Sequence, residues 1–215
     1  MRNETLYGSA LIASVLGMIV TAALHPTGAQ VVSSVESAEA FGRLAAGVHG
    51  LALASVAVSS FGLVGLSRQL DFERPDVAAA AVTWVMAVMG VICAASFSGF
   101  VAPEVAKAIF AAEEVDRHVL KEFFTYNGML NQAFAKFHVV ASSAAIVLWS
   151  IAMLRTGFGR LLGVVGCIVS IATVAALVAG RLIMDVHGLA IVEWSQGVWF
   201  VLSGVLLIRG SARVA

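Results

Sequence analysis

The stretch LLGVVGCIVSIATVAALVAG, residues 161–180, contains no charged side chain and no proline. A helix of about 20 apolar residues is what a bilayer core roughly 30 Å thick requires. Five further stretches of similar character follow the same rule, at residues 6–24, 44–66, 77–101, 137–154 and 189–208. The sequence therefore predicts an all-α, polytopic integral membrane protein, with six transmembrane helices in a single domain spanning residues 1–215.

The composition of the whole chain supports a membrane protein. Apolar residues make up 60% of the sequence, charged residues only 12%, and the mean hydropathy is +0.95. Soluble domains are about 45–50% apolar and about 25% charged. The net charge is zero and the basic residues are dispersed, so no nucleic-acid partner is expected. The lipid bilayer is the predicted partner, and Cys93 and Cys167 are interpreted as small packing residues within apolar runs.

The placement of arginine predicts which way the helices run. The connections on the same side as the two termini carry seven arginines. The opposite short loops carry only Arg43 and Arg181, once the long acidic segment 102–136 is set aside. Because cytoplasmic loops are enriched in Lys and Arg, both termini are predicted to be cytoplasmic, in a bacterial-type inner membrane. The six helices then form three outward hairpins.

The long connection after the third helix has a helical pattern of its own. Its apolar residues recur at spacings of three and four, at Val105, Ile109, Ala112, Val115, Val119 and Phe123. Pro103 suits the first turn of such a helix, and Glu104 suits its positive dipole end. This pattern predicts one amphipathic helix over residues 104–126, which lies along the outer interface and acts as a lid. The fourth transmembrane helix is expected to begin near Met129.

A short phrase containing histidine occurs twice. RLAAGVHGLAL at residues 43–53 and RLIMDVHGLAI at residues 181–191 agree at seven of eleven positions. They place His49 and His187 at the outer ends of the second and sixth helices, and FHVVA places His138 at the outer end of the fourth. This arrangement predicts a parallel repeat of helical hairpins that brings three imidazoles to a similar depth.

Histidines at this depth suggest a ligand-binding site. Ionisable groups within a membrane usually face the bundle interior or a wet cavity, and imidazole is the commonest protein metal ligand. Three converging imidazoles are typical of catalytic zinc, whereas two facing imidazoles can hold a haem b iron. We therefore predict His49, His138 and His187 as the metal ligands. Asn131 and Ser142, which share a helix face with His138, are predicted as orienting residues, and Glu193 as the catalytic, proton-handling acid.

A purely positional explanation competes with this prediction. Outer helix ends lie in the interfacial region, where histidine costs little, and a duplicated hairpin copies residues regardless of function. The set of three histidines is consistent with either explanation. His25, which precedes Pro26 at a chain turn, is interpreted as a turn residue.

Three classes of function follow from the sequence. The first is a redox or metal-dependent membrane enzyme, with a metal ion or single haem near the outer leaflet and a small-molecule or lipid-like substrate. The second is a transporter for a small solute, in which Glu193 and the histidines exchange protons. The third is an accessory membrane subunit without chemistry. An oligomer is compatible with all three.

Overall fold

The computed structural model describes residues 2–26, 33–184 and 186–212. These residues form helices and short connections, and contain no strand. In chain order the helices are α1 (Arg2–Leu24), α2 (Val35–Gln69), α3 (Pro75–Ser96), the π-helix η1 (Phe97–Val101), α4 (Ala102–Ala111), α5 (Glu114–Thr156), α6 (Arg160–Val178) and α7 (Val186–Ala212). Six helical stretches among them are long and apolar enough to cross a membrane, which confirms the predicted fold class.

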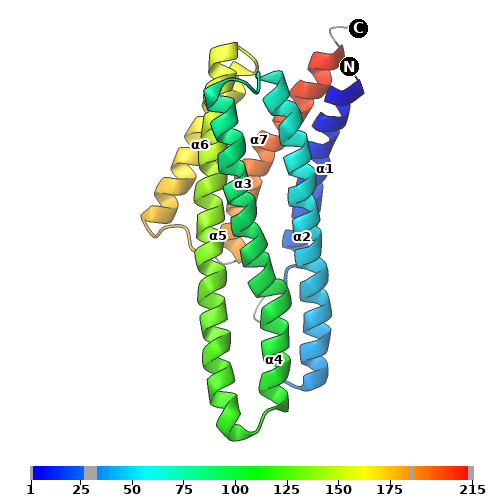
Figure 1. Ribbon diagram of the computed structural model, residues 1–215, viewed down its shortest axis with the longest axis vertical. Helices are drawn as coiled ribbons and strands as arrows, with labels where there is room; N and C mark the ends of the chain where they lie inside the picture. The colour runs from blue at the N-terminus through cyan, green and yellow to red at the C-terminus, as the bar shows by residue number, and fades with distance from the viewer. Residues whose placement is uncertain (1, 27–32, 185, 213–215) are drawn as a thin grey trace.

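The helices form an elongated bundle (Figure 1). The start of α1 and the end of α7 lie at the same end, which we call the terminal side; the opposite end is the far side. Helix α1 packs against α2 and α7, and α5 packs against α3 and α6. Contacts of α2 with α3, and of α6 with α7, close the six long helices into a ring. The interior of this ring holds the candidate site.

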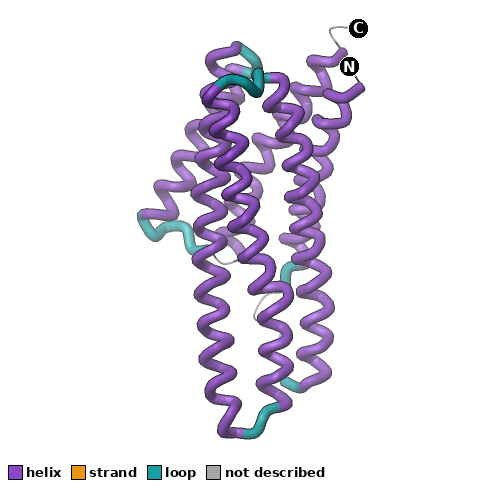
Figure 2. The backbone as a smooth tube through the Cα atoms, in the orientation of Figure 1, coloured by secondary structure: helices purple, strands orange, loops and turns teal. Residues whose placement is uncertain are grey.

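On the far side, α2, α4 and α5 extend well beyond the ends of α1 and α7 (Figure 1 and Figure 2). Helix α5 has 43 residues, so it is about 65 Å long, roughly twice the thickness of a bilayer core. The predicted single helix over residues 104–126 is wrong: α4 ends at Ala111, and Ala112 is extended with φ −80° and ψ 151°. The turn at Ala112 interrupts the apolar stripe, so Val105 is buried, whereas Val115 is 84% exposed.

The predicted break before Met129 is also absent, because α5 continues through Asn127 and Gly128. A tertiary contact stabilises this stretch. The side-chain amide of the buried Asn127 donates to the carbonyl of Phe97 at 3.1 Å. This hydrogen bond ties α5 to the π-helix and favours the helical conformation, although glycine lowers helix propensity by about 1 kcal/mol.

The π-helix η1 joins α3 to α4 without a break in the chain direction. Pro103 follows it, and a proline within a helix removes one hydrogen bond and collides with the carbonyl four residues earlier. The wider π turn accommodates this disruption locally. The prediction that the helix ends near Pro103 is therefore corrected: one helical stretch runs from Pro75 to Ala111.

An aromatic cluster fills the ring between its midplane and the terminal side. The cluster consists of Trp84, Trp149, Trp199 and Phe200. The Trp84 indole donates to Ser60 and the Trp149 indole donates to Ser67, both at 2.9 Å. These hydrogen bonds fix the two rings against α2. The aromatic cluster therefore closes the interior of the bundle on the terminal side.

Candidate functional site

A polar chamber of about 240 Å³ lies inside the ring, beyond the aromatic cluster and toward the far side. Its walls come from α1, α2, α3, η1, α5 and α7, together with the connections after α1 and before α7. Its polar and ionisable lining residues include His25, His49, Asn131, Gln132, His138 and Glu193. Three histidines and one acid thus share a single chamber.

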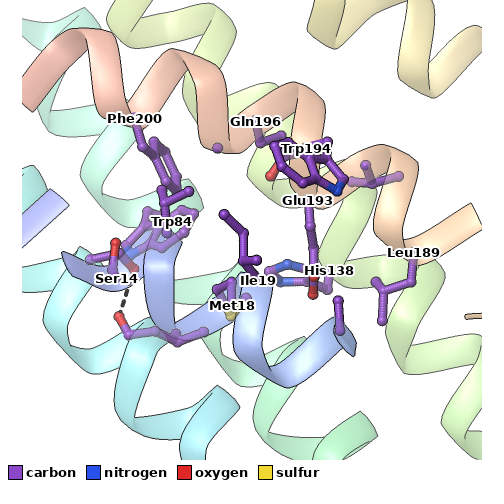
Figure 3. Close-up of a pocket in the computed structure, with 16 residues that line it drawn as sticks. Ser14, Met18, Ile19, Trp84, His138, Leu189, Glu193, Trp194, Gln196 and Phe200 are labelled. Atoms are coloured by element: carbon purple, nitrogen blue, oxygen red, sulfur yellow. Dashed lines mark hydrogen bonds between the residues drawn. The ribbon is translucent and has the colours of Figure 1, made fainter. Parts of the chain in front are cut away.

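An apolar chamber of about 50 Å³ adjoins it (Figure 3). Its walls include Met18, Ile19, Trp84, Trp194 and Phe200. The polar residues Ser14, Ser59 and Gln196 also line it. The two chambers share four lining residues: Met18, His138, Leu189 and Glu193. Glu193 and His138 therefore lie at the junction between a larger chamber that contains three histidines and a smaller chamber with aromatic walls.

In each of the three histidines that line the polar chamber, the ring nitrogen Nδ1 contacts a backbone carbonyl oxygen. His49 is bonded in this way to Ala45 at 2.8 Å, and His138 to Ala87 at 2.9 Å. His25 makes a longer contact of 3.2 Å with the Pro26 carbonyl. A carbonyl oxygen only accepts, so each Nδ1 must carry the proton. In the neutral ring Nε2 is then an acceptor, free to contact a ligand in the chamber.

His25 and His49 are in direct ring contact. Their ring centroids are 5.1 Å apart, and the planes meet edge to face at 66°. Burial lowers the pKa of His25, and the positive charge of a protonated His49 lowers the pKa further. The hydrogen bond to Pro26 opposes both effects. His25 therefore favours the neutral imidazole, with an open acceptor nitrogen.

The structure separates His187 from the other predicted ligands. His49 and His138 are buried, whereas His187 is exposed and lines neither chamber. Helical geometry explains this difference: His187 and Glu193 are six residues apart on α7, which puts them about 120° apart around the axis. Because Glu193 faces the interior, His187 points away from Glu193, and its side chain is exposed.

The other predicted residues have different surroundings. Asn131 lines the polar chamber beside His138, as its position on the same helix suggests. Ser142 is fully buried and lines neither chamber; its hydroxyl donates to the Val139 carbonyl and accepts from the side-chain amide of Gln196. Glu193 lines both chambers.

The geometry of the polar chamber bears on metal and haem binding. Within the described part of the chain, no three His, Cys, Asp or Glu side chains lie close enough together to hold a metal ion. The rings of His25 and His49 touch, so no porphyrin plane fits between them. Zinc or haem ligation by His49, His138 and His187 thus stays a prediction without support from this geometry.

Sequence reasoning missed three residues of the two chambers. From the sequence, His25 is interpreted as a turn residue. Its position at the far end of α1 is a signal that could have placed it at the same depth as His49. Gln132, whose side chain donates to the Met184 carbonyl at 2.7 Å, and Trp84 have no recognisable motif. Only the packing of helices distant in sequence brings them to the site.

Comparisons with protein-family models, curated proteins and solved structures give no match for this chain. The class that the fold defines is an all-helical protein with six candidate membrane spans. Any function must therefore be argued from the chambers themselves.

Proposed function

We propose that this protein is a proton-coupled transporter for a small solute, with Glu193 as the acid that binds and releases the proton. The observation that carries the proposal is the position of Glu193 at the junction of the two chambers. An acid within the apolar layer of a membrane usually marks a proton relay or a substrate pathway.

The charge balance of the chamber walls supports this role. Glu193 is the one acid among the described lining residues of the two chambers, and neither lysine nor arginine lines them. No ion pair of Glu193 is present in the described part of the structure. Glu193 is partly buried, and a carboxylate withdrawn from water without a cationic partner is costly, so a proton or a bound cation would balance its negative charge.

The packing on the terminal side of the chambers gives further support. The aromatic cluster separates the apolar chamber from the terminal side, whereas the polar chamber lies toward the far side. A carrier needs one state closed on each side of its binding site, and closure on the terminal side is what one of these two states requires. Movement of α7, which carries Glu193 as well as Trp199 and Phe200, would change both chambers together.

The proposal includes an orientation, with both ends of the chain in the cytoplasm of a bacterial-type cell. Arg68, Arg74, Arg155 and Arg160 lie at or between helix ends on the terminal side, in agreement with the positive-inside rule. An impermeant thiol reagent applied to intact cells tests this orientation. Glu113→Cys, on the far side, should be labelled, and Glu73→Cys should not; the reverse pattern would invert the topology.

Infrared difference spectroscopy tests the role of Glu193 directly. Purified protein in lipid nanodiscs is titrated between about pH 4 and about pH 9, and the carboxyl bands are compared with those of Glu193→Gln. We expect the variant to lose one carboxyl band that the control Glu39→Gln retains. Glu39 is an exposed acid outside both chambers, and it pairs with Lys107.

Two results would overturn the proposal. The first is a spectrum of Glu193→Gln that matches the wild-type spectrum over the whole titration, because Glu193 would then exchange no proton. The second is stoichiometric zinc, or a haem absorption band, in the purified protein. Either cofactor would favour the metal-dependent enzyme that the histidines also suggest.

A further inference from the structure

We infer that the solute is an amphipathic organic cation, whose charged head binds at Glu193 in the polar chamber and whose apolar tail enters the apolar chamber. This inference rests on the proposed function and extends it to a class of substrate.

The charge of the site selects a cation. The described walls of both chambers contain one carboxylate and no lysine or arginine. A cation at Glu193 would form an ion pair in a low-dielectric environment, where the attraction is far stronger than in water. An anion would be repelled there, and a neutral solute would leave the carboxylate either unpaired or protonated.

The histidines of the polar chamber add to this preference. In His49 and in His138, Nδ1 donates its proton to a backbone carbonyl. The other nitrogen of the neutral ring, Nε2, is therefore a hydrogen-bond acceptor for a ligand. An acceptor attracts the positively polarised hydrogens of an alkylammonium head. One of the two amide N–H groups of Gln132 is already donated to the Met184 carbonyl, at 2.7 Å.

The second chamber accounts for the apolar part of the solute. Trp84, Trp194 and Phe200 supply aromatic surface, and Met18 supplies an adaptable thioether. The indole of Trp84 is fixed by its bond to Ser60, so this wall is rigid. At about 50 Å³ the apolar chamber is much narrower than the polar chamber of about 240 Å³. A slender alkyl chain therefore fits better than a bulky ring system.

Binding and proton release are linked by charge balance. The protonated carboxyl of Glu193 loses its O–H proton to water, and the resulting carboxylate pairs with the incoming cation. No other bond changes, so one proton leaves for each cation that binds. A transport cycle then exchanges one proton for one monovalent cation.

Calorimetry with a matched pair of probes tests the inference. Hexyltrimethylammonium and hexanesulfonate have the same tail and opposite charges, and each is titrated into the full-length protein in nanodiscs of neutral lipid. Empty nanodiscs correct for partition into the lipid. We expect saturable binding of the cation, with one proton released per cation in buffers of different ionisation enthalpy, and no saturable binding of the anion.

The Glu193→Gln variant should bind the cation at least about tenfold more weakly and release no proton, whereas Glu39→Gln should behave like the wild type. A series of tetramethyl-, butyltrimethyl- and hexyltrimethylammonium on the unmodified protein tests the tail. We expect affinity to rise with chain length. Ala22→Leu, which fills the apolar chamber, should flatten that rise without abolishing binding of the tetramethyl compound.

Equal binding of hexanesulfonate, undiminished binding of the cation to Glu193→Gln, or the absence of cation binding to the wild type would overturn the inference. These outcomes are distinct from a failure of the proposed function. If the infrared band of Glu193 titrates but hexyltrimethylammonium does not bind, Glu193 exchanges protons and the solute belongs to another class. If the band is absent as well, both proposals fail.

Discussion

The imidazole of His25 contacts that of His49 edge to face, with the ring centroids 5.1 Å apart, and so ties the far end of α1 to the middle of α2. Both rings line the polar chamber. Protonation of either ring therefore adds positive charge beside the other, in a partly buried space. We therefore expect this end of the bundle to be sensitive to pH.

The first prediction concerns pH and stability. The pKa of His25 is lowered by burial and by the charge of His49, so the unfolded chain binds a proton more readily than the folded protein does. Stability should therefore be fully present above the ordinary histidine pKa of about 6.5, and should fall as the pH drops below it. Thermal unfolding of the protein in detergent, from about pH 8 to about pH 5, measures the effect.

His25→Gln serves as the comparison for this titration, because glutamine keeps a polar side chain and removes the titrating ring. We expect its melting temperature to fall less on acidification than that of the wild type. Identical slopes for the two proteins would show that His25 contributes nothing to the pH dependence.

The second prediction concerns the contact between the π-helix and His49. A Cβ atom at Gly99 would lie 2.5 Å from the Cβ of His49 and 2.6 Å from its Cγ, so Gly99→Ala must displace the imidazole. We expect a loss of about 1–3 kcal/mol in the free energy of unfolding, as for other overpacked sites. Denaturant unfolding followed by tryptophan fluorescence measures it.

Gly47→Ala is the matched control, because a Cβ at Gly47 on α2 would meet nothing within 4 Å. Alanine also has a higher helix propensity, so the control should be neutral or stabilising by up to about 1 kcal/mol. A Gly99→Ala protein as stable as this control would mean that η1 moves away from His49 at little cost.

The third prediction concerns the polar link between α5 and α7. The amide of Gln196 donates to Ser142 at 2.9 Å and to Ser143 at 3.3 Å, and all three side chains are buried. Gln196→Met keeps the size of the side chain and removes the donor, so we expect a loss of about 1–2 kcal/mol.

Ser195→Ala is the control for this link, because the Ser195 hydroxyl bonds only the carbonyl of Val192 in its own helix. It should change the unfolding free energy by less than about 0.5 kcal/mol. Chemical unfolding of the two variants decides the matter: equal stabilities would show that the link does not hold α7 against α5.

The fourth prediction compares two charged contacts. On the terminal side, Asp76 has a side chain only 9% exposed and pairs with Arg74 at 3.3 Å and with Arg155 at 3.1 Å. Asp76→Asn removes the charge that holds both cations, and should cost about 1–3 kcal/mol. On the far side, Glu39 and Lys107 are 44–45% exposed, so Glu39→Gln should cost less than about 1 kcal/mol. Denaturant unfolding of both variants tests the order, and a larger loss for Glu39→Gln would contradict it.

The candidate site could be predicted only in part. Glu193, His49, His138 and Asn131 stand out in the sequence because polar residues are scarce in apolar helices, and all four line the polar chamber. The prediction that His49, His138 and His187 form one site depends on the assumption that similar sequence segments have similar surroundings in the fold. His49 lies about four turns inside α2, whereas His187 lies in the first turn of α7.

The sequence alone determined the class of the fold, because runs of about 20 apolar residues can satisfy their backbone in a bilayer only as helices. The tertiary structure decided which polar side chains meet. A residue's direction depends on where its helix begins and how that helix is rotated against its neighbours, and contacts between distant segments set both. For this reason His25 lines the polar chamber, whereas His187 is exposed outside it.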